Sequence, residues 1–249
     1  MRKAPALSLV VPLKDEASNV VAVVEEVAAV LGPAVPDYEL ILVDDGSTDG
    51  TFEHMRRLHA ADPAHVIALR FARNFGQSAA FTAGFAAARA PLVATMDGDL
   101  QNDPADLPRL MALAASHDIV SGWRKLRQDA VLTRHVPSVI ANALIGFVSG
   151  VRLHDNGCSL KVYRAEVVKP LHLRPGMHRY LPAIASQLGG RVTEVVVNHR
   201  ARRFGESKYG LSRTFKVLAD LVHLRRVMRE ALVPPPAGAP LYEIGERLE

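Results

Sequence analysis

Two aspartates separated by one glycine are the residues of this sequence whose types and spacing are best suited to chemistry. They lie in the segment VATMDGDLQND, where a short apolar run stops at Asp97, Gly98 and Asp99. Side chains two positions apart in a strand point the same way, so we expect both carboxylates to face one spot at the strand's end. Two crowded carboxylates repel each other, and a divalent ion that also holds a diphosphate would relieve that repulsion.

The residues around the two aspartates fit the same hypothesis or have a simpler role. Gly98 has no side chain to block a ligand that approaches the backbone. Asp103 and Pro104 have the pattern of a helix N-cap followed by the first helical residue. The alternative interpretation of the whole segment is a polar turn that caps a strand, but this leaves Asp97 and Asp99 unexplained.

Length and composition describe one large domain, or a domain with an extension, that can bury a sizeable core. The chain has 249 residues, of which 49% are hydrophobic and 22% are charged. A net charge of +4 is too small to indicate nucleic-acid binding, and it permits an anionic ligand or membrane surface. The single cysteine, Cys158, cannot form an internal disulfide, which favours a reducing compartment.

No run of 18 or more apolar residues occurs, so we expect no transmembrane helix. The nearest approach is the segment 135–151, which contains no Asp, Glu, Lys or Arg. It is either a core helix or a helix that lies against a lipid. The N-terminal apolar run is too short for a signal peptide and is better interpreted as a first buried strand.

Apolar runs alternate with segments of helical spacing through the first half of the chain. We expect strands at residues 7–13, 38–43, 65–69 and 92–96, and helices at residues 18–31, 51–61 and 76–88. This alternation predicts an α/β fold with a mainly parallel sheet covered by helices on both faces. Polar clusters follow each expected strand, at the edge where ligands bind in such sheets.

The second half is expected to add a helix at residues 105–116, strands at residues 118–121, 159–163 and 192–199, and a basic loop at residues 200–210. An amphipathic helix is predicted at residues 211–230, with three arginines near its end. Residues 1–230 would form a single domain. The Pro-rich segment 231–249 is predicted to be a flexible tail.

Phosphate groups in this protein need ligands other than a glycine-rich loop, because both the G-x-G-x-x-G fingerprint and the Walker A motif are absent. A metal ion and basic side chains would have to hold them. Asp45, at the end of a predicted strand, could bind a ribose hydroxyl or a base N–H. The basic candidates are Arg73, Arg124, Arg134, Arg202, Arg203 and Lys208.

Five motifs occur in an order that resembles glycosyltransferase family 2. They are VVPLKDE (residues 10–16), VDDGSTDGT (43–51), RNFGQ (73–77), MDGDLQNDP (96–104) and FGESKYG (204–210). The resemblance covers residues 7–222, and its last motif together with RNFGQ is similar to the polyprenyl-phosphate branch, which resembles dolichyl-phosphate mannose synthase. One departure is Lys14, where many relatives carry an aromatic residue.

The resemblance implies a GT-A fold, a Rossmann-like single domain, and assigns roles to particular residues. Those implied for the nucleotide-sugar are Pro12, Glu16, Val43, Asp45, Asp97, Gly98, Gln101, Arg202, Arg203 and Lys208. Those implied for Mg²⁺ or Mn²⁺ are Asp97, Asp99 and Gln101. Those implied for the acceptor phosphate are Arg124, Arg134 and Ser138.

An inverting transfer to a lipid phosphate is the reaction that this resemblance implies. The acceptor phosphate is already ionised near neutral pH, so arginines need only align it with the anomeric carbon. A hydroxyl acceptor is the alternative, and Asp155 would then have to act as the base. A simple turn is an equal interpretation of Asp155, and a binding protein without turnover is the non-catalytic alternative.

The expected partners are a UDP- or GDP-linked sugar and a polyprenyl phosphate, with no nucleic acid. The basic end of the segment 211–230 could rest on an anionic leaflet, so we expect a peripheral enzyme at the cytoplasmic face of the membrane. A basic helix end that is favourable to its own dipole is the structural alternative. A separate membrane protein could supply an anchor.

Overall fold

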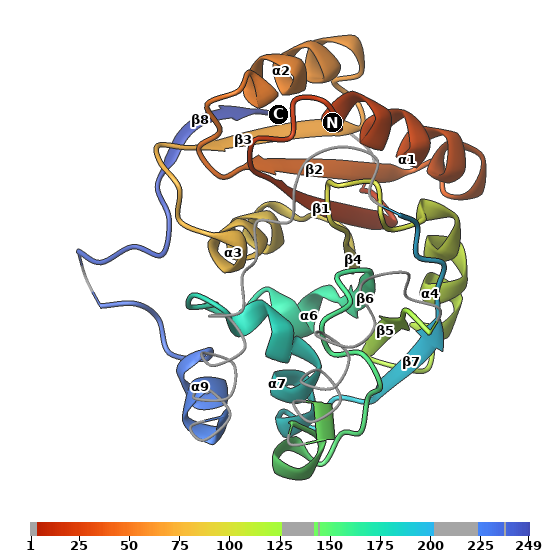
Figure 1. Cartoon of the computed structure of the whole chain (residues 1–249), viewed down its shortest axis with the longest axis vertical. Coiled ribbons are helices and arrows are strands. Elements are labelled where there is room, and N and C mark those ends of the chain that lie inside the picture. The colour runs from red at the N-terminus through yellow and green to blue at the C-terminus, as the bar shows by residue number, and fades with distance from the viewer. Residues whose placement is uncertain (1–3, 126–141, 144, 202–223, 237) are drawn as a thin grey trace.

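Eight strands form one mixed sheet in the part of the chain that the computed structural model describes, which is residues 4–125, 142–143, 145–201, 224–236 and 238–249 (Figure 1). The strand order across the sheet is β7-β5-β6-β4-β1-β2-β3-β8. The strands are β1 (Leu7–Leu13), β2 (Tyr38–Asp44), β3 (Val66–Phe71), β4 (Leu92–Thr95), β5 (Ile119–Trp123), β6 (Lys161–Arg164), β7 (Val192–Val196) and β8 (Ile244–Leu248).

Helices cover both faces of this sheet, with α1 and α2 on one side and α3 on the other (Figure 1). The long helices are α1 (Val20–Ala34), α2 (Thr51–Ala61) and α3 (Gln77–Ala87). The shorter ones are η1 (Pro104–Asp106), α4 (Leu107–Leu113), α6 (Ala165–Val168), η2 (Met177–Tyr180), α7 (Leu181–Gln187) and α9 (Leu224–Glu230).

The strands of the first half run parallel, and two later strands, β6 and β8, run against them. β1 pairs in parallel with β2 and with β4, and β2 pairs in parallel with β3. β6 is antiparallel to both β4 and β5, while β5 and β7 are parallel. The predicted α/β fold with a mainly parallel sheet is confirmed. The reversed direction of β6 brings the chain just before that strand to the edge where β4 and β5 end.

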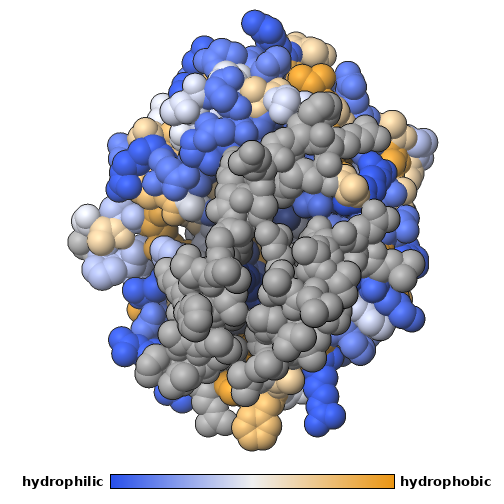
Figure 2. Space-filling view, in the orientation of Figure 1, coloured by the Kyte–Doolittle hydropathy of each residue, from blue (hydrophilic) through white to orange (hydrophobic). Residues whose placement is uncertain are grey.

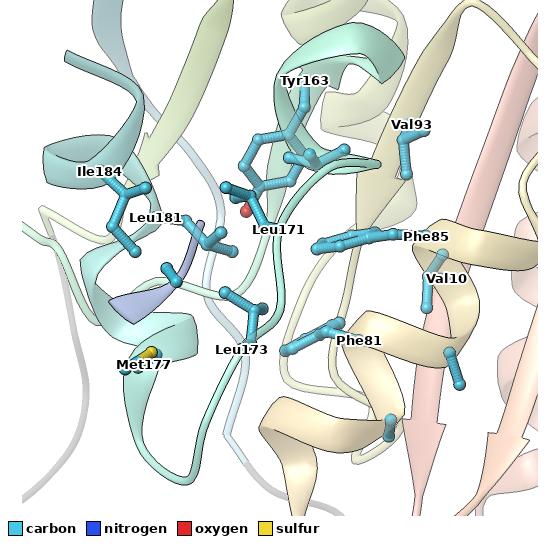
Figure 3. Close-up of a cluster of buried hydrophobic side chains, with 14 of the residues drawn as sticks. Val10, Phe81, Phe85, Val93, Tyr163, Leu171, Leu173, Met177, Leu181 and Ile184 are labelled. Atoms are coloured by element: carbon cyan, nitrogen blue, oxygen red, sulfur yellow. The ribbon is translucent and has the colours of Figure 1, made fainter. Parts of the chain in front are cut away.

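Two hydrophobic clusters, one on each face, hold the helices to the sheet. Along β1, Val10 belongs to one cluster, and Leu9 and Val11 belong to the other. Figure 3 shows the first cluster, in which Phe81 and Phe85 of α3 lie opposite residues of η2 and α7. Because both faces of each central strand are covered, these strands are mostly apolar, as the sequence predicts. Buried polar exceptions are Ser8 and Glu39, which are hydrogen-bonded to each other over 2.6 Å.

The structure differs from the predicted elements in several places, one of which is α6, a short helix that was not predicted. β4 ends at Thr95, one residue earlier than expected, so the DGD segment begins outside the strand. The helices η2 and α7 were not predicted. The expected flexible tail is wrong for its last residues, because β8 pairs antiparallel with β3 and Tyr242 stacks on Phe71. Of the predicted helix at residues 211–230, the described residues include α9 alone.

The coloured surface in Figure 2 is largely hydrophilic, and apolar residues occur on it singly or in small groups. Phe147 is the most exposed of the large apolar residues in the described part of the chain. No helix within the described residues has both the length and the apolar character needed to cross a bilayer.

Candidate active site

The polar segments that follow β1 and β2 are bound to each other at the carboxyl edge of the sheet. The backbone N–H of Asp15 donates to Ser47 Oγ over 2.8 Å, and the N–H of Thr48 donates to Asp15 Oδ1 over 2.8 Å. Glu16 N–H donates to Thr51 Oγ1 over 2.9 Å. Asp15 adopts a positive φ of 52°, a left-handed conformation that an aspartate tolerates better than most residues. These hydrogen bonds fix the motifs VVPLKDE and VDDGSTDGT to each other, and together the two segments form one wall of the site.

Asp45 connects this wall to the RNFGQ motif. Its carboxylate accepts hydrogen bonds from the backbone N–H groups of Phe75, over 2.6 Å, and Gly76, over 2.9 Å. Gly46 allows the close approach, because a Cβ there would lie 2.6 Å from the carbonyl carbon of Arg73. Burial raises the pKa of Asp45, although the two amides oppose that effect. A ribose hydroxyl, the ligand predicted for Asp45, would have to share these oxygens.

Asp97 is held by donors on both carboxylate oxygens. Gln77 Nε2 donates to Oδ1 over 2.8 Å, and Ser159 Oγ lies 2.7 Å from Oδ2. The backbone N–H of Asp97 donates to Asn102 Oδ1 over 3.1 Å. Ser159 Oγ also lies 2.9 Å from Asn102 Oδ1, but it carries one proton, and the charged carboxylate is the stronger acceptor. Neither Gln77 nor Ser159 was predicted as a site residue.

Asp99 lies two residues farther along a strained loop and is 9% exposed. Its Oδ1 accepts the backbone N–H of Gln101 over 3.2 Å, and Leu100 between them has a φ of +63°. Because β4 ends at Thr95, strand alternation does not orient the two aspartates, and that part of the prediction is wrong. Hydrogen bonds from outside the loop, from Gln77 and Ser159, orient Asp97 instead, and the backbone N–H of Gln101 donates to Asp99.

Gly98 packs closely against the end of the neighbouring strand β1. A Cβ on Gly98 would lie 2.3 Å from Leu13 Cδ2 and 3.4 Å from the carbonyl oxygen of Pro12. The expected reason, ligand access, is therefore joined by a close contact with the end of β1. Asp103 caps η1 as predicted, since its side chain accepts the N–H of Ala105 over 3.1 Å.

Gln101 connects the DGD loop to Arg200, the first residue of the predicted basic loop. Its Nε2 donates to the carbonyl oxygen of Arg200 over 3.3 Å, and Arg200 N–H donates back to the Gln101 carbonyl over 2.8 Å. The Arg200 side chain pairs with Glu26 at 2.6 Å and with Asp103 at 2.8 Å. The metal role predicted for Gln101 stays a prediction, and its observed contact is structural.

Arg124 and Asp155, which were predicted separately, form one buried ion pair. The Arg124 Nε donates to Asp155 Oδ2 over 2.7 Å, and Nη2 donates to Oδ1 over 3.0 Å. Their side chains are only 9% and 11% exposed. Burial opposes ionisation of Asp155, but the hydrogen bonds and charge of Arg124 outweigh it and hold the pKa of Asp155 below its usual value.

Such a carboxylate is poorly suited to be a general base. Its oxygens are engaged by a guanidinium, and a group with a lowered pKa has little affinity for a proton. Asp155 instead orients Arg124, whose bidentate ion pair leaves the rest of its guanidinium to bind an anion.

Lys161 is a further charged residue at this edge that sequence reasoning missed. It is 2% exposed at the first position of β6, and its ammonium donates to the backbone carbonyls of Asn156, over 3.2 Å, and Cys158. Burial lowers the pKa of Lys161 and raises the pKa of the Cys158 thiol to about 11. A lysine within the apolar run CSLKVY was the available signal, because an unpaired buried charge is costly and a partner is implied.

The remaining predicted residues lie in the core, at a helix start or outside the described chain. Val43 is fully buried and packs in the core, so its side chain supports β2 and cannot line a ligand site. Glu16 accepts Asn19 Nδ2 over 2.6 Å at the start of α1, and Pro12 pairs with Val43 across β1 and β2. Outside the described residues lie Arg134, Ser138, Arg202, Arg203 and Lys208.

The donor set of the DGD loop fits a divalent ion completed by a substrate. Mg²⁺ is usually bound by one or two carboxylates together with water and substrate phosphates. No group of three or more His, Cys, Asp or Glu side chains converges within the described residues. Asp97 and Asp99 would therefore be the protein's contribution, and phosphate oxygens would fill the other positions.

Comparison with known proteins identifies the family. The sequence pattern of glycosyl transferase family 2 matches residues 8–171. This chain belongs to glycosyl transferase family 2. The resemblance found in the five motifs is thus confirmed, and the chain is a glycosyltransferase.

Curated relatives of this family 2 chain are named for polyprenyl-phosphate sugar transfer. A dodecaprenyl-phosphate galacturonate synthase of Rhizobium johnstonii is 47% identical over 90% of this chain and 67% of its own length. An undecaprenyl-phosphate 4-deoxy-4-formamido-L-arabinose transferase of Aeromonas hydrophila is 36% identical over 87% of this chain and 66% of its own length. The chain thus spans about two thirds of the length of these relatives, and it resembles the polyprenyl-phosphate branch as predicted.

A solved structure supports the fold of the family 2 chain. The glucosyl-3-phosphoglycerate synthase of Mycobacterium tuberculosis, in complex with Mn²⁺, uridine diphosphate and glucosyl-3-phosphoglycerate, superposes with a TM-score of 0.64. It is 18% identical, and the match covers 93% of this chain and 82% of that one. The GT-A fold is confirmed by this likeness.

Proposed function

We propose that this chain transfers a sugar from a UDP- or GDP-linked donor to a polyprenyl phosphate, with inversion at the anomeric carbon. The observation that carries the proposal is the buried Arg124–Asp155 pair beside the DGD loop. Ser159, four residues after Asp155, donates to Asp97 over 2.7 Å. A cation for an acceptor phosphate and a carboxylate for a metal-bound diphosphate are therefore held by one short segment.

The donor would bind along the carboxyl edge, with its nucleoside against the wall formed by the segments after β1 and β2. Asp45 and Glu16 are the carboxylates proposed to bind the nucleoside. The relative named for galacturonate makes a uronic acid donor the first to test. Arg202, Arg203 and Lys208 are proposed to bind the diphosphate.

Asp97 and Asp99 would hold Mg²⁺ or Mn²⁺. When bound, the ion would neutralise the charge that develops on the leaving nucleoside diphosphate. Gln77 and Ser159 keep Asp97 in a fixed orientation before the donor arrives. Such preorganisation avoids reorientation of the carboxylate during the reaction.

The acceptor phosphate would be aligned by Arg124, together with Arg134 and Ser138 from the predicted acceptor set. A phosphate oxygen attacks the anomeric carbon as the bond to the diphosphate breaks. The nucleophile is ionised before it binds, so no protein base is needed. The lowered pKa of Asp155 and its contacts with Arg124 disfavour the hydroxyl-acceptor alternative, in which Asp155 is the base.

The lipid acceptor places the reaction at a membrane surface, and we propose the cytoplasmic face, where nucleotide-sugars are made. The basic segment after residue 200 would supply peripheral contact with anionic lipid. A separate membrane protein could act as an anchor.

The test is transfer of radiolabelled sugar from a panel of UDP- and GDP-sugars, including UDP-galacturonate, to polyprenyl phosphate in detergent. Product should enter the organic phase with Mg²⁺ or Mn²⁺ and should be lost with EDTA and in Asp99→Asn. Asp118→Asn is the matched control, because Asp118 lies at the opposite end of β5 and pairs with Arg164 and Arg191. Donor binding without transfer to lipid would contradict the lipid acceptor.

A further inference from the structure

The ammonium of Lys161 is buried beneath the segment of residues 155–159. That segment contacts both Arg124 and the DGD loop. In the sheet it stands opposite Thr95 of β4 and Ser121 of β5. Both of these strands run toward the carboxyl edge, and β6 begins there. Lys161 therefore lies behind the DGD loop and behind Arg124 at the same time.

The ammonium of Lys161 is satisfied by backbone oxygens. Nζ donates to the carbonyls of Asn156 and Cys158, which belong to the segment of residues 155–159. Thr95 Oγ1 donates to a third carbonyl of that segment, at Ser159, over 2.6 Å. Backbone carbonyls that are turned toward a buried cation are held strongly, because leaving either partner unpaired in the interior is costly.

Two side chains of the same segment, at its start and at its end, bind groups proposed for catalysis. Asp155 at its start binds Arg124 through both prongs of the guanidinium. Ser159 at its end donates to Asp97. The segment is thus fixed from below by Lys161 and Thr95, and it orients one cation and one carboxylate above.

We propose that Lys161 is a positioning residue that holds the backbone of residues 155–159, and through it sets Arg124 and Asp97 for sugar transfer. This inference rests on the proposed function. Lys161 touches neither substrate. It affects the binding of both substrates. Asp155 at one end of the segment orients Arg124 for the acceptor, and Ser159 at the other end orients Asp97 for the donor.

A lysine that only stabilises the fold would give a different pattern of effects. It would lower the melting temperature and the amount of active protein, but it would leave the KM values of the surviving enzyme unchanged. A positioning lysine changes both KM values as well as kcat. A displacement of about 1 Å in such a segment can cost ~100-fold in rate.

The experiment compares Lys161→Met with Val162→Ala, a matched change at the next residue of β6, which is also fully buried but packs in the hydrophobic core. Steady-state kinetics are measured with donor and acceptor varied in turn. Amide hydrogen exchange follows the N–H of Cys158, which donates to the Asp155 carbonyl over 3.3 Å.

We expect Lys161→Met to lower kcat by about 10- to 100-fold, to raise the KM of both substrates and to speed exchange at Cys158. Val162→Ala should lower the melting temperature alone. Ser159→Ala should raise the donor KM and Asp155→Asn the acceptor KM. Adding Ser159→Ala to Lys161→Met should raise the donor KM little further, and adding Asp155→Asn should raise the acceptor KM little further. The effects of substitutions at coupled residues are not additive.

Unchanged KM values and unchanged exchange in a folded Lys161→Met would overturn the inference, as would full additivity in both double variants. If Lys161→Met does not fold, Thr95→Val is the second variant, because it removes one donor to the same segment. It should change kcat, both KM values and the exchange at Cys158 in the same direction but by less. A wild-type chain that transfers no sugar would contradict the proposed function, and hydrogen exchange would then decide whether Lys161 holds the segment.

Discussion

Arg124 and Asp155 lie 31 positions apart and form a two-pronged ion pair whose side chains are both about nine-tenths buried. The pair joins the end of β5 to the segment that precedes β6. It defines the direction in which the guanidinium faces, and it occupies the carboxylate that a hydroxyl acceptor would need as a base. The ion pair therefore favours a phosphate acceptor over a hydroxyl.

Asp155→Ala should destabilise the protein by about 3–5 kcal/mol at pH 7, because it leaves Arg124 buried without its partner. The pKa of Asp155 is lowered in the fold, so its stabilising contribution is complete above the unfolded value of about 4 and is lost as the pH falls through the lower folded value. Urea unfolding of the wild type and the variant at pH 7 and at lower pH measures this. The difference in the free energy of unfolding between the wild type and Asp155→Ala should become smaller at low pH.

The surface control for that change is Asp118→Ala, whose ion pairs are more exposed and should contribute at most about 1 kcal/mol. The double variant Arg124→Leu/Asp155→Ala should recover part of the lost stability without activity. Equal losses of unfolding free energy in Asp155→Ala and Asp118→Ala would show that the buried ion pair stabilises the protein no more than the exposed ion pairs do.

Gln77→Leu and Ser159→Ala should each weaken metal-dependent donor binding by about tenfold, since each removes one hydrogen bond to a charged carboxylate, Asp97. Titration calorimetry with the nucleotide-sugar and Mn²⁺ measures the change. Ser121→Ala is the matched control, because the hydroxyl of this buried serine donates to the carbonyl of Gly122, at 3.5 Å, and not to Asp97. Donor affinity that is unaffected by both changes would exclude a positioning role for these two side chains.

Asp45→Asn should leave the protein at least as stable at pH 7, but should weaken donor binding. Burial raises the pKa of Asp45 in the fold, so its ionisation opposes folding; that cost is absent below the unfolded pKa and appears as the pH rises through it. Thermal unfolding should therefore favour the variant at pH 7, and the difference should vanish near pH 3. A variant that is less stable at neutral pH would indicate that the amide bonds to Phe75 and Gly76 outweigh the burial of charge.

Removal of residues 241–249 should destabilise the protein and promote self-association. β8 covers the edge of β3, and Tyr242 stacks on Phe71 with ring centroids 5.3 Å apart. An uncovered edge strand offers unpaired backbone groups to other chains. Calorimetry and size-exclusion chromatography would detect both effects. The control is Arg56→Ala, which removes the exposed ion pair with Glu246 and a cation–π contact with Phe52 but keeps β8. A shortened chain that stays monomeric with an unchanged melting temperature would contradict a structural role for β8.

Local sequence was sufficient for most of the first half of the fold. α2 has its predicted bounds, and the strands near residues 7–13, 38–43, 65–69 and 92–96 are all present within a residue or two. Apolar runs and helical spacing are properties of neighbouring residues, so they can be recognised without a structure. Because the strands are parallel, the same patterns also placed Asp45 and Asp97 at one edge.

Residues that act through distant partners could not be predicted in this way. The contact of Asp97 with Ser159 spans 62 positions, and that of Asp45 with Phe75 spans 30. Ser159 carries no local signal of its role, and the RNFGQ motif that contains Gln77 does not identify Asp97 as its partner. Lys161 has one, a charge within an apolar run, but its partners are backbone carbonyls that sequence does not identify.

The sequence by itself thus determined the fold class, the edge at which ligands bind and the family of the chain, because these depend on local patterns and ordered motifs. The tertiary structure alone decided that β6 runs antiparallel between β4 and β5. Strand direction and neighbour choice depend on packing between segments far apart in the chain. That one reversal brings residues 155–159 to the DGD loop, pairs Asp155 with Arg124, and places Lys161 beneath both.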